Sequence, residues 1–86
     1  MTFEVEWDYP ARVAFARIPW PRSADVAALV YRFATTRAAD LESGAYPLRG
    51  AGYRIAVRVN HAVIPGDARE RSPTGTVLVL YLEPLG

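Results

Sequence analysis

Hydrophobic and polar residues alternate at the start of the chain. In the stretch "TFEVEW", Phe3, Val5 and Trp7 are separated by single polar residues. A two-residue period with β-branched and aromatic residues is typical of a strand with one buried face. Asp8 then fits a helix N-cap, and Pro10 fits the first helical turn, where its missing N–H has no effect. We therefore predict a strand that is followed directly by a helix.

The next segment, "YPARVAFARI", has a different period. Ala11, Ala14, Phe15 and Ile18 follow the i, i+3, i+4, i+7 spacing of one helix face. This spacing favours a helix, and a strand over residues 13–18 is the alternative that stays open.

Two prolines in "PWPRS" end this element, because proline cannot continue a helix and restricts the residue before it. Ser23 is a candidate N-cap for a second helix, and Asp25 in its first turn would complement the positive end of the helix dipole. We expect this helix to end within residues 36–41, before Gly44, so that the two helices form a hairpin. One side of the second helix is predicted to carry Val26, Leu29, Val30, Phe33 and Arg37.

The second half of the chain predicts three strands. "AYPLRG" and "YRIAVRV" are separated by a glycine-rich tight turn at residues 50–52. In the second of these strands, Arg54, Ala56 and Arg58 alternate with larger apolar residues and face the opposite way. A polar loop, "IPGDARERSPTG", precedes the last strand.

That last strand, "TVLVLYLE", is apolar on both faces, which is typical of a central strand or of a strand covered by a partner. Its alternation favours a position for Tyr81 in the core, on the same side as Val77 and Val79, and a role for Tyr81 as a proton donor or stacking platform is the alternative. The whole pattern predicts an α+β fold of order β-α-α-β-β-β, with an antiparallel-rich sheet and a helical hairpin packed on one face.

The composition describes one folded domain and excludes several classes of protein. The chain has 86 residues, of which 51% are hydrophobic and 22% are charged. No apolar run approaches the ~20 residues of a membrane span and no leader-like segment is present, so we expect a cytoplasmic protein without a membrane partner. With no cysteine, one histidine and no phosphate-binding glycine motif, we expect no metal and no cofactor.

The net charge of +1 does not by itself indicate nucleic-acid binding, so the position of the cations decides. Arg49, Arg54 and Arg58 lie close together in the chain, and guanidinium groups bind phosphate through paired hydrogen bonds. The alternative is that Glu4 and Glu6 neutralise Arg54 and Arg58 in cross-strand pairs, each of which contributes only ~0.2–1 kcal/mol.

Three further side chains near the arginines have two interpretations each. His61 is the only histidine, and imidazole is suited to proton transfer near neutral pH, but a lone histidine at a strand end is commonly an ordinary surface residue. Tyr46 and Tyr53 flank the arginines and are candidates for stacking on bases. Half-buried strand tyrosines explain them equally well.

The element order, with the stretches "FEVEW", "RFATTRAADL", "LRG", "GYRIAV" and "TVLVLYL", resembles the RelE/ParE toxin superfamily of bacterial toxin–antitoxin modules. The resemblance covers most of the chain and implies a single RelE/ParE-like domain over residues 1–86, held inactive by an antitoxin protein. In the RelE branch the toxin is an endoribonuclease that enters the ribosome and cleaves mRNA. In the ParE branch the target is DNA gyrase, and no nuclease activity is needed.

The resemblance assigns Arg54 in "GYR" to an arginine of the family, and Arg49 in "LRG" to a basic residue of the preceding strand. Arg58 and His61 complete the candidate catalytic set, although Arg58 lies further along than the family pattern requires. The connection over residues 60–75 is longer than the family's usual hairpin.

A second departure concerns the end of the sequence, "EPLG", where active ribonucleases of the family carry a basic, tyrosine-bearing tail. This departure favours a non-catalytic member of the fold that acts through protein contacts, either with gyrase or with a regulatory partner. A small subunit of an unrelated complex is a third interpretation.

Overall fold

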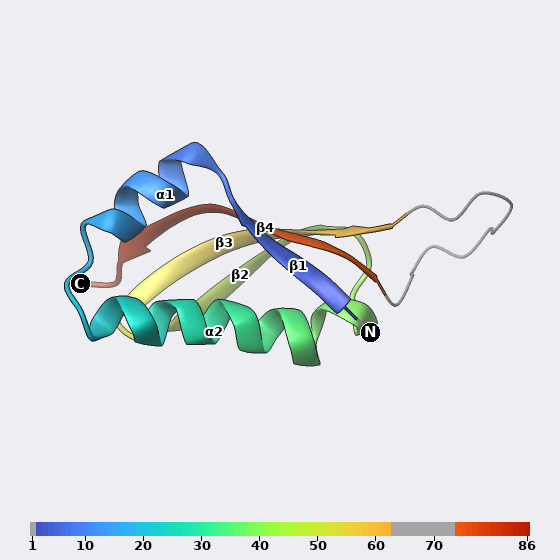
Figure 1. Cartoon of the computed structure of the whole chain (residues 1–86), viewed down its shortest axis with the longest axis horizontal. Helices are drawn as coiled ribbons and strands as arrows, with labels where there is room; N and C mark the ends of the chain where they lie inside the picture. The colour runs from blue at the N-terminus through green and yellow to red at the C-terminus, as the bar shows by residue number, and fades with distance from the viewer. Residues whose placement is uncertain (1, 63–73) are drawn as a thin grey trace, which may run out of the picture.

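A computed structural model describes residues 2–62 and 74–86. Within these residues the predicted β-α-α-β-β-β order is confirmed, with a short 3-10 helix added after the second helix (Figure 1). The elements are β1 (Thr2–Trp7), α1 (Tyr9–Ala16), α2 (Arg22–Thr36), η1 (Ala38–Asp40), β2 (Gly44–Gly50), β3 (Tyr53–His61) and β4 (Thr74–Pro84).

The four strands form one mixed sheet in the order β1-β4-β3-β2. β1 pairs with β4 in parallel, whereas β4 with β3 and β3 with β2 are antiparallel, so the sheet is mostly antiparallel as predicted. β4 lies inside the sheet, which explains why its sequence is apolar on both faces. The first and last elements of the chain are therefore direct neighbours.

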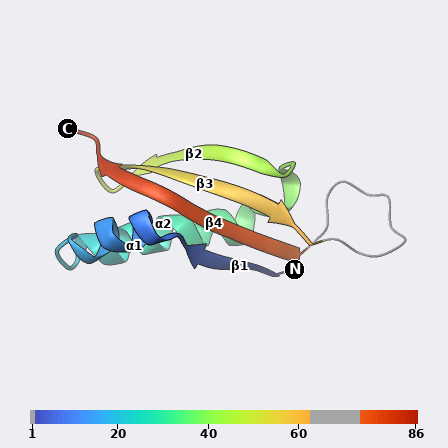
Figure 2. The ribbon, with the colours of Figure 1, turned by 90° about the horizontal axis from the view of Figure 1, so that it is seen from above.

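Both helices pack against the sheet, and Figure 2 shows them on the same side of β2 and β3. The helical interpretation of residues 9–18 is confirmed in place of the strand. Asp8 caps α1, because its carboxylate accepts a hydrogen bond from the N–H of Tyr9 at 2.9 Å, and Pro10 occupies the first turn. No helix in the described part of the chain is long and apolar enough to cross a bilayer.

The start of α2 differs from the prediction. Ser23 is not the N-cap: the helix begins at Arg22, and Pro21 occupies the cap position without a side-chain hydrogen bond. The carbonyl of Pro21 already accepts a hydrogen bond from the N–H of Asp25 at 3.3 Å, so the first turn closes earlier than a Ser23 cap would allow. Asp25 lies in the first turn as expected, and Thr36 ends the helix within the predicted range.

The core lies between the helices and the inner face of the sheet. The predicted side of α2 is buried along most of its length, but Arg37 at its C-terminal end is exposed. Burial of each large apolar side chain contributes about 1.5–3 kcal/mol relative to its exposed state. The largest fully buried side chains are Ile55, Val26, Val30, Val57, Val59, Val77 and Val79.

The alternation of β4 is interrupted by a β-bulge. Val79 keeps regular pairing with β3, whereas Tyr81 pairs with Ala56, so that Leu80 has no partner of its own. One extra residue reverses the facing of every residue that follows it. The prediction that Tyr81 lies in the core is therefore wrong: Tyr81 is 47% exposed, and Leu82 is buried instead.

The connection between β2 and β3 is the predicted tight turn. Ala51 and Gly52 both have positive φ, 54° and 81°, which is the geometry of a short hairpin turn. The polar loop predicted before the last strand falls mostly within residues 63–73, outside the described residues. Its last two residues, Thr74 and Gly75, are instead the first residues of β4.

Candidate functional site

The side of the sheet opposite the helices is not covered by another element within the described residues, and we call it the open face. Leu78 and Leu80 of β4 are half-buried but do not belong to the core cluster. The side chains of the open face are those that alternate with the core residues, together with Leu80 at the bulge. They are Glu4 and Glu6 of β1, Thr76, Leu78, Leu80, Tyr81 and Glu83 of β4, Arg54, Ala56, Arg58 and Asn60 of β3, and Ala45, Pro47 and Arg49 of β2.

The open face brings three of the four predicted site residues together. Arg49 and Arg54 are direct register partners across β2 and β3, and both are exposed. Arg58 is four residues further along β3, about 13 Å from Arg54 along the strand. Like charges directly opposite each other destabilise a sheet, so an anion that bridges Arg49 and Arg54 would be stabilised there.

Arg54 has a carboxylate neighbour on the same face. Its Nη1 lies 3.2 Å from Oε1 of Glu83, and both side chains are 51% exposed. An exposed pair of this kind contributes at most about 1 kcal/mol, so another anion can replace the carboxylate. Arg49 and Arg58 form no ion pair with any residue in the described ranges.

The alternative interpretation was that Glu4 and Glu6 neutralise Arg54 and Arg58. The structure does not place these side chains next to each other. β4 lies between β1 and β3, so these carboxylates are two strands, about 10 Å, away from the arginines. Cross-strand charge pairing does occur, but only for Arg54 and with Glu83. The remaining arginine charge of the open face is exposed to solvent.

Tyr81 is the residue of this face that the sequence pattern misplaced. It pairs with Ala56, which lies between Arg54 and Arg58 on β3. An exposed phenol offers a flat surface for a nucleobase and a hydroxyl that donates or accepts a hydrogen bond. The bulge at Leu80 brings it here, and no glycine or proline in the sequence indicates that bulge.

The two tyrosines that flank the arginines in the sequence lie on the core side of the sheet. Tyr46 and Tyr53 are half-buried and pack against the core cluster. The Tyr46 hydroxyl donates a hydrogen bond to the carbonyl oxygen of Glu42 at 2.6 Å. These contacts favour the interpretation of both residues as strand tyrosines over a role in base stacking.

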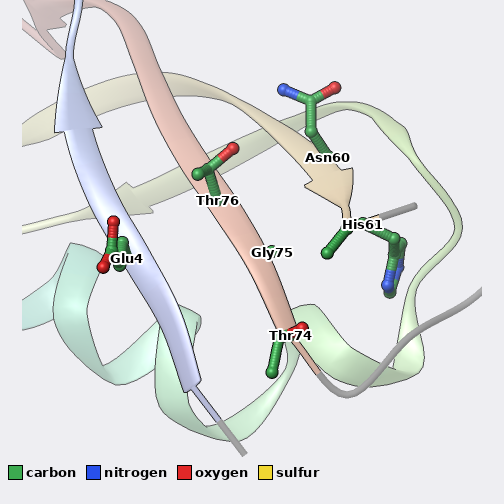
Figure 3. Close-up of a pocket in the computed structure, with 7 residues that line it drawn as sticks. Glu4, Asn60, His61, Thr74, Gly75 and Thr76 are labelled. Carbon is green, nitrogen blue, oxygen red and sulfur yellow. The ribbon is translucent and has the colours of Figure 1, made fainter. Parts of the chain in front are cut away.

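His61 is not brought together with the arginines. It has the same alternation as Val59, so its ring lies on the inner side, edge-on to the ring of Phe3 with 5.3 Å between centroids. Its Nε2–H donates a hydrogen bond to the carbonyl oxygen of Leu41. Figure 3 shows the ring pointing away from the side chain of Asn60, the preceding residue, which lies on the open face.

Near His61 the open face ends in a hollow of about 480 Å³ (Figure 3). Glu4, Asn60 and Thr76 line it from three neighbouring strands, and none of the described residues that line it is an arginine. A carboxylate without a cation repels anions, so this hollow is not part of the arginine set. In residues 2–62 and 74–86 no three histidine or carboxylate side chains converge on a point where they could hold a metal ion.

No protein-family model matches this chain, and no curated protein is significantly similar to it. A proposal about function therefore rests on the fold and on the open face.

Proposed function

We propose that this protein is a RelE/ParE-like toxin, or a toxin-derived protein, of a toxin–antitoxin module, and that its open face binds RNA in the translation machinery of the cytoplasm. The observation that carries the proposal is the gathering of Arg49, Arg54, Arg58 and Tyr81 on one uncovered sheet face. The β-α-α-β-β-β order, which the resemblance implies, also supports it. The antitoxin protein is the expected partner.

The chemistry of this face suits the cleavage of RNA by attack of its own 2′-oxygen. That reaction needs a proton acceptor, a proton donor and cationic stabilisation of the extra negative charge on the phosphate. Arginines supply the third through charge-assisted hydrogen bonds, but they are poor bases because the guanidinium group keeps its proton in proteins. Glu83, in contact with Arg54, is suited to accept the proton of the 2′-hydroxyl, and Tyr81 is suited to protonate the leaving oxygen.

Cell-free bacterial translation tests this proposal. Purified protein is added to the reaction, and both the yield of a reporter protein and the integrity of its mRNA are measured. We expect a lower yield together with cut mRNA. Unchanged yield and intact mRNA in the presence of a well-folded protein would overturn the ribonuclease proposal.

Replacement of Glu83 by Gln is predicted to change RNA binding and RNA cleavage in opposite directions. The substitution frees Arg54 and removes a negative charge from the face, so the affinity for single-stranded RNA should rise about three- to tenfold. It also removes the proton acceptor, so cleavage should fall at least about tenfold. Binding is measured by fluorescence anisotropy with a labelled oligoribonucleotide, and cleavage on programmed ribosomes. Unchanged affinity would show that Glu83 does not compete with phosphate.

A non-catalytic member of the same fold is the second candidate. Leu78 and Leu80 leave apolar surface on the open face beside the arginines, and such surface is typical of a protein partner. DNA gyrase or a regulatory protein would then be the target. Inhibition of gyrase supercoiling by a protein that leaves translation and mRNA unchanged would favour this candidate.

A further inference from the structure

The charges of the open face form a pattern that is complementary to itself. In one row across the sheet, Glu6 of β1, Leu78 of β4 and Arg58 of β3 are register neighbours. An apolar residue is thus flanked by an acid on one side and by a base on the other. The adjacent row places polar side chains at the same three strand positions, and Figure 3 shows them: Glu4, Thr76 and Asn60.

We propose that two copies of this chain pair through their open faces, with a twofold axis that runs along β4 between the two sheets. Such an axis exchanges the two sides of β4 but keeps the level along the strand. Glu6 of each copy therefore faces Arg58 of the other, and Leu78 of one copy faces Leu78 of the second. A single surface patch thereby satisfies itself, as an isologous interface requires.

The dimensions of the face are compatible with this arrangement. Two packed sheets lie about 10 Å apart, a gap that a glutamate and an arginine side chain can bridge from opposite sides. Sheet twist separates the corners of stacked sheets, so the closest contact falls at the centre, where Leu78, Leu80 and Tyr81 lie. Their exposed area, including the 47% exposure of Tyr81, is what the second copy would cover.

A second copy fits the charges better than other occupants do. A purely anionic partner matches Arg49, Arg54 and Arg58 but is repelled by Glu4 and Glu6 along β1. A purely apolar partner matches the centre but takes these charges out of water without a partner, which is unfavourable. At the level of Leu78, the second copy supplies an apolar centre, an acidic side and a basic side in the required order. Glu83, further along β4, lies on the axis opposite its own copy, and its ion pair with Arg54 offsets that like charge.

The area indicates a weak dimer. The axis along β4 brings only β1, β4 and β3 of the two copies into overlap, a width of about 10 Å, and the described face extends about 20 Å along β4. An interface of this size lies below the about 1,200 Å² of standard specific interfaces, so we expect a transient dimer with a dissociation constant on the order of 100 μM. The inference does not depend on the proposed function, but the dimer would cover Arg58 and Tyr81, two of the residues proposed to bind RNA.

Sedimentation velocity of the full chain, over concentrations from about 1 to about 500 μM, tests the dimer with a charge-swap series. Because of the twofold axis, Glu6→Arg or Arg58→Glu alone creates two like-charge contacts, and each should weaken the dimer at least about tenfold. The double variant Glu6→Arg with Arg58→Glu restores both pairs and should return the dissociation constant to within about threefold of the original. Arg32→Glu, an exposed change on α2, should leave it unchanged.

Three outcomes would overturn the inference. A monomer throughout the concentration range excludes the dimer, and a dimer that Glu6→Arg does not weaken uses another surface. A double variant that stays as weak as the single variants shows that Glu6 and Arg58 do not face each other. Circular dichroism of each variant confirms that it is folded, and recovery by the double variant cannot arise from misfolding. The sedimentation experiment contains no RNA and no ribosome. Its failure therefore leaves the proposed action on translation unaffected, and the reverse also holds.

Discussion

Replacement of Arg54 by Ala is expected to lower mRNA cleavage by about 100- to 1,000-fold. Arg54 is the arginine closest to both predicted proton-transfer groups, because it contacts Glu83 and neighbours Tyr81 across β3 and β4. Removal of one donor that stabilises developing negative charge typically has an effect of this size on the chemical step. The rate is measured on programmed ribosomes at saturating protein, so that a loss of affinity does not contribute.

The control for this prediction is Arg32→Ala, which removes an exposed arginine from α2 on the other side of the molecule. It should leave cleavage within about twofold of the original protein. Loss of the exposed Arg54–Glu83 pair should change the free energy of unfolding by at most about 1 kcal/mol, so both variants are expected to fold. A folded Arg54→Ala protein that cleaves at the original rate would contradict the role of the open face.

Replacement of Gly75 by Ala is expected to lower the free energy of unfolding by about 3 kcal/mol. Gly75 lies in β4 and pairs with Phe3 on one side and His61 on the other. A Cβ at this position would overlap the carbonyl oxygen of Asn60 and come within 2.9 Å of both the His61 Cα and the Phe3 ring. Backbone atoms cannot move aside as a flexible side chain can, so the strands must separate locally. Urea denaturation followed by circular dichroism measures the change.

Gly86→Ala is the matched control, because a Cβ at Gly86 meets no atom within 4 Å. It should change the free energy of unfolding by no more than about 0.5 kcal/mol. Equal stability of the two variants would mean that β3 and β4 are not as closely paired at this end as the structure shows.

The parts of the fold that the sequence predicted correctly depend on local patterns. A strand presents successive side chains to opposite faces, so the alternation around Val5 and around Ile55 was enough to assign their buried sides. The capping of α1 by Asp8 depends on the residues next to it. The same alternation placed Arg54 and Arg58 on one face, and the structure confirms that arrangement and adds Arg49 beside Arg54.

The errors came from features that local patterns do not contain. Strand order is set by long-range packing, so the sequence did not show that β4 separates Glu6 from Arg58. The bulge at Leu80 adds one residue without a special residue type, and this misplaced Tyr81. His61 is a different case: its alternation with Val59 already placed it on the inner side, apart from the arginines, and that signal was present in the sequence.

The central position of β4 has a consequence for synthesis. β1 pairs with β4, and β3 pairs with both β2 and β4, so β4, synthesised after the other three strands, completes the sheet to which β1 belongs. A nascent chain that ends before residue 74 can form the β2–β3 hairpin and the helices, but β1 has no strand partner and the apolar inner face stays incomplete. Contacts between distant segments also slow folding. The domain is therefore expected to fold after β4 has left the exit tunnel. Before that point the incomplete chain exposes apolar surface, and it should then depend most on chaperones.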